Sequence, residues 1–174
     1  MTEDVPPGLT DKGSIRILIV EDDPDHADII QDYLKPEGYQ VQVVRSQESA
    51  LAVLKEGAPD LVVLDLMLDE KRDVARPRGY EVCRRLRADP RTADIPVLMF
   101  TVLDQLEEIE RGVEVDADDY LVKFSTPPEV RFRVESLLRV RHIKNRARRM
   151  IAYLRLLDEG QGQTPGPPRS ASGR

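Results

Sequence analysis

The chain is poor in the residues that make disulfides and zinc sites. Its 174 residues include one cysteine, Cys83, and two histidines, His26 and His142. A single cysteine excludes an intramolecular disulfide, and two separated histidines form no zinc-type cluster. Any bound metal should therefore be held by oxygen. Neither histidine lies in a recognisable motif, so we expect both on the surface, whereas the apolar neighbours of Cys83 predict a small core residue.

Long apolar stretches are also missing. The longest apolar runs have four to six residues, and residues 1–14 contain acids, prolines and glycines but no signal-peptide hydrophobic region. These absences predict a soluble, cytoplasmic protein with no membrane contact. The length suits one domain with a core and an appendage, and hardly suits two full domains.

The net charge of −6 is distributed unevenly. Residues 129–158 hold nine Lys or Arg and three Asp or Glu, so an acidic body is followed by a basic C-terminal segment. A basic helix can contact nucleic acid or an acidic partner, or it can be a solvated face. Without aromatic residues that read bases, the segment favours a solvated face or a protein partner, and nucleic acid is not expected.

Strand-like and helix-like patterns alternate about five times, which predicts an α/β fold with a doubly wound parallel sheet. The expected strands are 15–20, 40–44, 60–65, 95–100 and 119–123. The expected helices are 24–35, 47–56, 79–88, 104–114 and a long one over 127–158. Asp23 before Pro24 predicts the start of the first helix, and Asp104 with Glu107 predicts that of the fourth.

The second half of the long helix carries an apolar repeat with the spacing of a coiled coil. Its members are Val140, Ile143, Ala147, Met150, Leu154 and Leu157. The stripe can join two copies of the chain or dock on another protein, or it can fold back onto its own domain. Beyond Gly160 the Gly, Pro, Ser and Gln content predicts a disordered tail.

Three carboxylates follow two of the apolar runs. Glu21 and Asp22 close the run 17–20, and Asp65 closes the run 61–64. Short apolar runs predict buried parallel strands, whose carboxyl ends share one edge of the sheet, so the three acids should meet there. At an effective dielectric near 20, each pair roughly 5 Å apart repels by about 3 kcal/mol. A hard divalent cation would relieve this repulsion.

Two further polar residues end later strands, Thr101 after 97–100 and Lys123 after 119–122. Taken singly, each of the five has an ordinary explanation, such as a capping acid, a turn residue or a solvated charge. Together, at four strand ends, they resemble the receiver domain of bacterial two-component response regulators, with its CheY-like, flavodoxin-like fold. The matching segments are ILIVEDDP at 17–24, DLVVLDLML at 60–68 and ADDYLVK at 117–123.

The resemblance implies a role for each residue. The phosphoacceptor would be Asp65, taking a phosphoryl group from a histidine kinase or a histidine phosphotransfer protein. The ligands of Mg²⁺, or Mn²⁺, would be Glu21, Asp22, Asp65 and the backbone carbonyl of Met67. The residues that contact the phosphoryl group and switch in response would be Thr101, Lys123 and Tyr120.

The resemblance also divides the chain. It implies a receiver domain at 14–140. Composition and the apolar repeat divide the remainder into a flexible segment at 1–13, a helical extension with a possible coiled coil at 141–159, and a disordered tail at 160–174. The chain would be a single-domain response regulator and not an enzyme, signalling through phosphorylation-dependent contacts with a downstream protein. A homodimer through 140–157 is possible.

Two alternatives remain. One is a non-switching interaction module that kept the fold. The other is a Mg²⁺-dependent phosphatase with an aspartate nucleophile. The second is disfavoured because those enzymes need a carboxylate two residues after the nucleophile, and Met67 stands there.

Three positions depart from the family. Phe124 follows Lys123 where the family usually has proline, which predicts a trans peptide bond and an altered reach of the lysine. Val102 replaces a smaller residue after Thr101 and predicts slower exchange of small donors and of water. A charged insertion at 69–78 predicts a mobile surface loop, which is either a specificity element for the histidine-bearing partner or a harmless addition.

Overall fold

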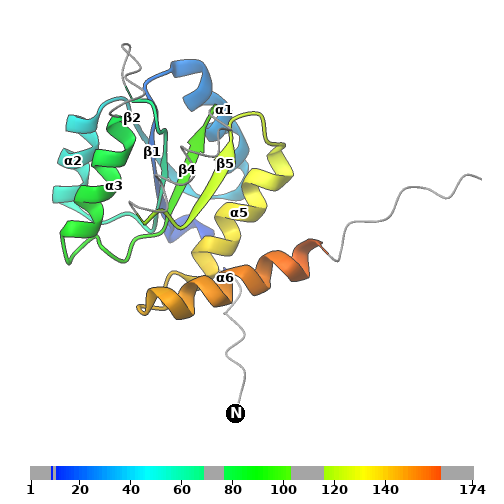
Figure 1. Cartoon of the computed structure of the whole chain (residues 1–174). Coiled ribbons are helices and arrows are strands. Elements are labelled where there is room, and N and C mark those ends of the chain that lie inside the picture. The colour runs from blue at the N-terminus through cyan, green and yellow to red at the C-terminus, as the bar shows by residue number, and fades with distance from the viewer. Residues whose placement is uncertain (1–8, 10, 69–76, 103–115, 162–174) are drawn as a thin grey trace, which may run out of the picture.

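A five-stranded parallel sheet forms the centre of the protein, in the order β2-β1-β3-β4-β5 (Figure 1). The computed structural model describes residues 9, 11–68, 77–102 and 116–161. The strands are β1 (Arg16–Val20), β2 (Gln40–Val44), β3 (Leu61–Leu64), β4 (Val97–Thr101) and β5 (Asp119–Val122). The predicted parallel α/β fold is confirmed.

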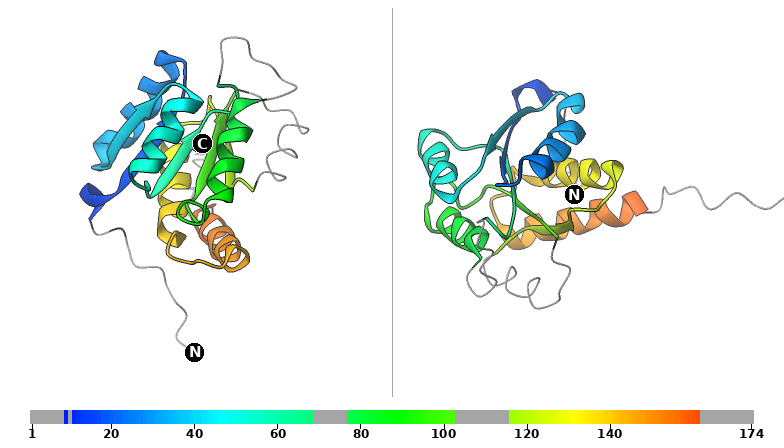
Figure 2. Two further views of the ribbon diagram at one scale, coloured as in Figure 1. Left: turned by 90° about the vertical axis from the view of Figure 1, so that its left-hand side faces the viewer. Right: turned by 90° about the horizontal axis from the view of Figure 1, so that it is seen from above.

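Helices cover both faces of the sheet, α1 and α5 on one side and α2 and α3 on the other (Figure 2). The helical elements are η1 (Lys12–Ser14), α1 (Pro24–Leu34), η2 (Lys35–Glu37), α2 (Gln47–Glu56), α3 (Arg78–Ala88), α5 (Pro127–Val140) and α6 (Arg146–Gln161). The expected helix at 104–114, most of the insertion at 69–78, the N-terminal eight residues and the tail from 162 lie outside the described residues. No described helix is long and apolar enough to cross a membrane.

Side chains of the central strands alternate between two apolar cores, as the pleat of a sheet requires. Ile17, Ile19 and Val63 pack under α1 and α5, whereas Leu18 and Val62 pack under α2 and α3. Because both faces are covered, strands β3 and β4 are buried along their whole length, and β1 is buried from Ile17 onward. Cys83 lies in the second core and is buried, as predicted.

The start of α1 follows the predicted chemistry and determines where the acids lie. The carboxylate of Asp23 accepts hydrogen bonds from the amides of Asp25 at 2.9 Å and His26 at 3.3 Å, and Pro24 occupies the first turn. The helix therefore begins immediately after Glu21 and Asp22, which stay at the edge of the sheet.

Gly79, in the first turn of α3, lies against the backbone of the chain that follows β3. A Cβ atom there would overlap the carbonyl oxygen of Asp65 and lie 2.8 Å from that of Leu66. The Gly79 amide also donates to the Leu66 carbonyl at 3.0 Å. Beyond the insertion the chain thus returns to the backbone of the predicted phosphoacceptor, and only glycine permits this approach.

The C-terminal helical extension is present, but it is not continuous with α5. The single helix expected over 127–158 is wrong, because α5 ends at Val140 and α6 begins at Arg146. The side chain of Asn145 accepts from the Arg148 amide at 3.0 Å, so a new helix is capped there. This break lets α6 cross α5 (Figure 1).

The apolar stripe folds back onto its own domain, which was one of the two alternatives for it. Tyr153 and Leu157 are buried in the core beneath α5, and Ile143 and Met150 pack against that core. Gly160 lies against the ring of Phe132. Most of the stripe is therefore occupied within the chain.

The basic segment finds acidic partners in the body of the same chain. Its ion pairs include Arg133–Asp119 at 3.0 Å, Arg146–Asp116 at 2.9 Å, Arg149–Asp118 at 3.5 Å and Arg141–Asp60 at 3.3 Å. Arg149 is 2% exposed, and Asp118 is also held by Arg87 at 2.8 Å. Part of the charge asymmetry of the sequence is thus explained by ion pairs that attach α5 and α6 to the acidic body of the chain.

Candidate functional site

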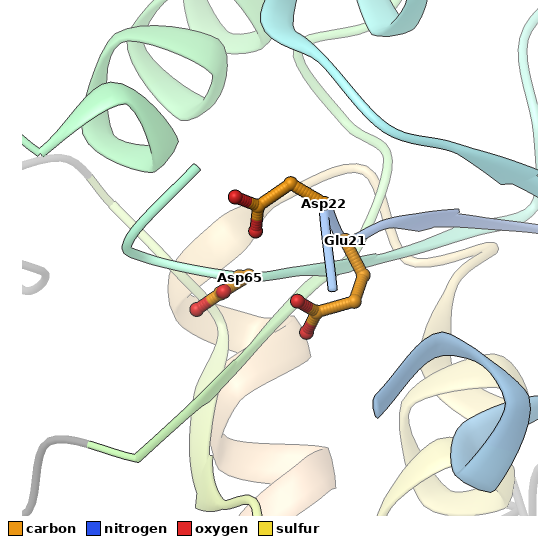
Figure 3. A group of neighbouring side chains, drawn as sticks. All are labelled: Glu21, Asp22 and Asp65. Carbon is orange, nitrogen blue, oxygen red and sulfur yellow. The ribbon is translucent and has the colours of Figure 1, made fainter. Parts of the chain in front are cut away.

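Three carboxylates meet at the carboxyl edge of the sheet, as predicted (Figure 3). Glu21 and Asp22 follow β1, Asp65 follows β3, and each contributes an oxygen to a group whose members all lie within 4.8 Å of one another. The Asp65 amide donates to the carbonyl of Val20 at 2.9 Å, which aligns the two strand ends. Glu21 and Asp65 are buried and Asp22 is half-buried.

Lys123 places its ammonium inside this acidic group. Its Nζ lies 2.5 Å from Oε2 of Glu21 and 2.9 Å from Oδ2 of Asp65. The lysine side chain is 2% exposed, so both ion pairs are shielded from water. The bond to Phe124 is trans, as predicted, and the Phe124 ring points to solvent. The lysine therefore reaches the aspartate without the proline that usually follows it.

Burial makes Glu21 the acid that resists ionisation. Desolvation, followed by the negative charge of Asp65, raises the pKa of Glu21 to about 7, although the ammonium of Lys123 opposes the shift. The Asp23 amide donates to Oε1 of Glu21 at 3.2 Å and also favours the ionised form. Full ionisation of the acidic group is thus unfavourable even with one lysine ammonium beside it.

The residues at this edge fit a hard divalent cation. Three carboxylates offer oxygen ligands within a small volume, which suits Mg²⁺ or Mn²⁺, and they carry an excess of negative charge. The Met67 amide donates to Oδ1 of Asp65 at 3.1 Å, which fixes the backbone of the residue whose carbonyl is expected to be a fourth ligand. Receiver domains bind Mg²⁺ at such an acidic site.

Thr101 and Tyr120 lie on the two strands at the far side of the site. Thr101 ends β4, is 3% exposed, and its carbonyl accepts from the Lys123 amide at 2.9 Å. Tyr120 faces the core under α2 and α3, and its buried hydroxyl has no hydrogen-bond partner among the described residues. Burial, together with neighbouring Tyr80 and Cys83, raises the pKa of Tyr120. The hydroxyl is therefore shielded from solvent, although β5 is an edge strand.

His26 is a site neighbour that the sequence did not reveal. Its Nδ1 lies 3.3 Å from Nζ of Lys123 and 3.5 Å from Oδ2 of Asp23, and its side chain is 25% exposed. The expectation of a surface histidine without a partner was wrong. The available signal was its position in the first turn of α1, which faces back toward the acids that precede the helix.

The doubly wound parallel sheet, with acids around a buried lysine at its carboxyl edge, is the arrangement of a signal-receiver domain. Residues 17–135 match the profile of the response regulator receiver domain. The chain belongs to this family, whose members are signalling proteins.

Among curated proteins, the chain is 44% identical over 124 residues to the DNA-binding dual master transcriptional regulator RpaA of Synechocystis, covering 71% of this chain and 49% of the relative. The chain spans about half the length of the curated relatives it matches.

Two solved structures extend the comparison. The BeF3-activated N-terminal receiver domain of Klebsiella pneumoniae RstA is 33% identical with a TM-score of 0.61, covering 71% of this chain and 98% of that one. The receiver domain of the Pseudomonas aeruginosa sensor histidine kinase PA1611, which has a magnesium ion in its active-site cleft, shares the fold at 24% identity and a TM-score of 0.62. That match covers 72% of this chain and 97% of the other.

Proposed function

We propose that Asp65 accepts a phosphoryl group from a phosphohistidine on a histidine kinase or a histidine phosphotransfer protein. The observation that carries this proposal is the Lys123–Asp65 ion pair, with Nζ 2.9 Å from Oδ2 in a buried setting. A site that only holds a metal has no use for an ammonium among its carboxylates. A site that receives an anionic group does, because the ammonium can pass from the carboxylate to a phosphoryl oxygen.

The negative charge of the acidic group explains why it needs a bound cation before phosphoryl transfer. Glu21, Asp22 and Asp65 would repel both one another and an incoming phosphoryl group. Mg²⁺ bound by these residues and by the Met67 carbonyl supplies positive charge that offsets this repulsion. Glu21 must then be ionised, although its pKa is raised in the cation-free protein.

In the transfer step a carboxylate oxygen of Asp65 attacks phosphorus. An O–P bond forms as the P–N bond to the imidazole breaks, and the leaving imidazole takes a proton from solvent. Lys123 then contacts a phosphoryl oxygen, and the hydroxyl of Thr101, at the end of the neighbouring strand, contacts another.

Phosphorylation would signal to a partner by changing the surface around β4 and β5. Tyr120 is suited to a two-state role, because a buried hydroxyl without a partner gains free energy by finding one elsewhere. Movement of Thr101 toward the phosphoryl group would open that alternative. This argues against the non-switching module, and Met67 in the general-acid position argues against the phosphatase.

The proposed partners are the histidine-bearing donor and a downstream protein, in the cytoplasm where ATP-derived phosphoryl groups are made. RpaA is named as a DNA-binding protein, and the chain covers about half of it. The basic residues of α5 and α6 are largely engaged with acids of the same chain. We therefore assign protein contacts, and not DNA contacts, to the residues described.

The test is adduct formation with acetyl phosphate and, separately, with beryllofluoride, both in the presence of Mg²⁺. Mass spectrometry should find one phosphoryl group after acetyl phosphate, and native mass spectrometry one bound beryllofluoride, on the wild type and on Asp28→Asn, an exposed carboxylate of α1 used as the matched control. Asp65→Asn should carry none. An adduct that survives Asp65→Asn, or its absence from the wild type, refutes the proposal.

A further inference from the structure

A groove lies between the C-terminal ends of α2 and α3. The two helices pack side by side on one face of the sheet (Figure 2). Each follows a parallel strand, so both run away from the carboxyl edge of the sheet. The groove has a volume of about 310 Å³, which is at the small end of the range for small-molecule sites. It lies at the end of the domain opposite to Asp65.

The floor of the groove is apolar and continuous with the core. Leu54 and Leu86 are buried, and the half-buried Leu51 packs against the same core. The hydroxyl of Thr92, which also lines the groove, donates to the carbonyl of Leu86 at 2.9 Å. Because this hydroxyl is engaged within the protein, the floor offers a ligand mainly aliphatic contacts.

The rim of the groove carries more cations than acids. The charged residues that line it are Lys55, Arg85, Arg91 and Asp89. Arg91 is paired with Asp89 at 2.7 Å, and Arg85 is paired with Glu81 at 2.9 Å. Lys55 is exposed and makes no ion pair within the described part of the chain. Its ammonium is therefore available to an anion bound in the groove.

The other charges near the groove do not cancel this excess. Glu56 follows Lys55 but lines a separate cavity, between α2 and β2. Arg84 is exposed and shares the carboxylate of Glu81 with Arg85. The C-terminal ends of both helices carry partial negative charge, which the cations of their last turns offset first. The groove should therefore prefer an anion to a cation only modestly.

We propose that this groove binds a small amphiphilic carboxylate, with its aliphatic chain over the three leucines of the floor and its carboxylate beside Lys55. The apolar floor selects the chain, and the free ammonium at the rim selects the charge of its head group. The ligand is a small molecule because a stable protein partner would need to cover about 800 Å² of this surface. A groove of this volume is matched instead to a short aliphatic chain.

This site is separate from the proposed phosphoacceptor. The groove is formed by the ends of α2 and α3 that lie farthest from the carboxyl edge of the sheet. Adduct formation at Asp65 should therefore be the same in Lys55→Glu as in the wild type. Failure of either proposal would leave the other unaffected.

Two-dimensional NMR of the ¹⁵N-labelled full chain, titrated with hexanoate, octanoate and decanoate below their micelle concentrations, tests the proposal. Amide shifts at residues 51–56 and 85–92 should saturate, with a dissociation constant of about 1 mM for octanoate. A fully buried methylene strengthens binding by about fourfold, so two more methylenes in this open groove should strengthen it by about three- to tenfold. Octylamine, with the same chain and the opposite charge, should bind about tenfold more weakly than octanoate.

Two variants locate the two ends of the ligand. Leu51→Gln should weaken octanoate binding by about fivefold or more, and Lys55→Glu should remove the preference for octanoate over octylamine. Ile29→Gln and Lys35→Glu alter exposed residues on the other face of the sheet and are the matched controls, which should bind octanoate like the wild type. Shifts that do not saturate, or an affinity that is independent of chain length, would overturn the proposal. So would binding in Leu51→Gln and Lys55→Glu that equals that of the controls.

Discussion

The ammonium of Lys123 lies 2.5 Å from Glu21 and 2.9 Å from Asp65, so one buried cation bridges the ends of β1 and β3. A divalent cation at this site would bind the same two carboxylates that the ammonium already contacts. The two cations would therefore compete for the carboxylates, although the proposed transfer uses both.

Removal of that ammonium should tighten metal binding. In Lys123→Ala the acidic group loses a like-charged competitor, and we expect the Mg²⁺ dissociation constant to fall by about tenfold, measured by isothermal titration calorimetry. Lys55→Ala, an exposed lysine on α2, should leave it unchanged. Equal or weaker Mg²⁺ binding in Lys123→Ala would show that the lysine organises the carboxylates more than it competes for them.

Glu21 should make the cation-free protein less stable as pH rises. Its folded-state pKa of about 7 is above the ordinary value of 4.5, so its favourable contribution is complete below pH 4.5 and is lost as pH rises through 7. Glu21→Gln should remove this slope and stabilise the protein at pH 8 by on the order of 3 kcal/mol. Urea unfolding with EDTA at pH 5.5, 7 and 8.5 measures it; identical slopes for both proteins would contradict the assignment.

His26 supplies the third acceptor around the Lys123 ammonium, which has three N–H donors. We expect His26→Ala to slow phosphorylation by acetyl phosphate by about three- to tenfold, because the lysine is held less well. His26→Gln keeps an acceptor on the side chain and should retain most of the rate. If alanine and glutamine behave alike, the contact does not position the lysine.

Gly79 should tolerate no side chain. Gly79→Ala forces a methyl group into the carbonyls of Asp65 and Leu66, and we expect a loss of on the order of 3 kcal/mol in unfolding free energy. Gly13→Ala is the matched control, since its Cβ would meet its nearest neighbour at an ordinary 3.4 Å. Thermal and urea denaturation compare the two; similar losses would mean that the close approach is relieved elsewhere.

Arg149 should hold α6 on the domain. Arg149→Ala removes one of the two arginines that pair with Asp118 among the described residues and opens a buried contact, so the unfolding free energy should fall by on the order of 3 kcal/mol. Hydrogen exchange in α6 should rise more than in α1. Arg148→Ala, one residue away and exposed, should change neither quantity. Unchanged protection of α6 in Arg149→Ala would show that Tyr153 and Leu157 suffice.

The sequence was informative wherever a pattern depends on neighbours along the chain. Strands β3 and β4 could be placed because buried parallel strands are unbroken apolar runs, and α1 because Asp23 and Pro24 cap it locally. The meeting of Glu21 with Asp65 followed from topology, since parallel strands end at the same edge.

Contacts between distant segments could not be predicted in the same way. Arg149 and Asp118 lie 31 positions apart, and nothing in either neighbourhood identifies the other. The break before α6 had a local signal in Asn145, but the apolar spacing continues through it and favoured one long helix. The partner of His26 likewise depends on how α1 is oriented over the sheet.

Strand β5 links the contact that holds α6 on the domain, at one end of the strand, to the lysine of the acidic site, at the other end. Asp119, its first residue, accepts a hydrogen bond from the Tyr153 hydroxyl of α6, and Lys123 follows its last residue. Four extended residues span only about 13 Å and have little freedom to absorb a displacement. A shift of Lys123 during the proposed phosphoryl transfer would therefore move β5 and alter the contact between Asp119 and Tyr153. By linkage, if phosphorylation changes how tightly α6 is held on the domain, then a change in how α6 is held alters the free energy of phosphorylation by the same coupling.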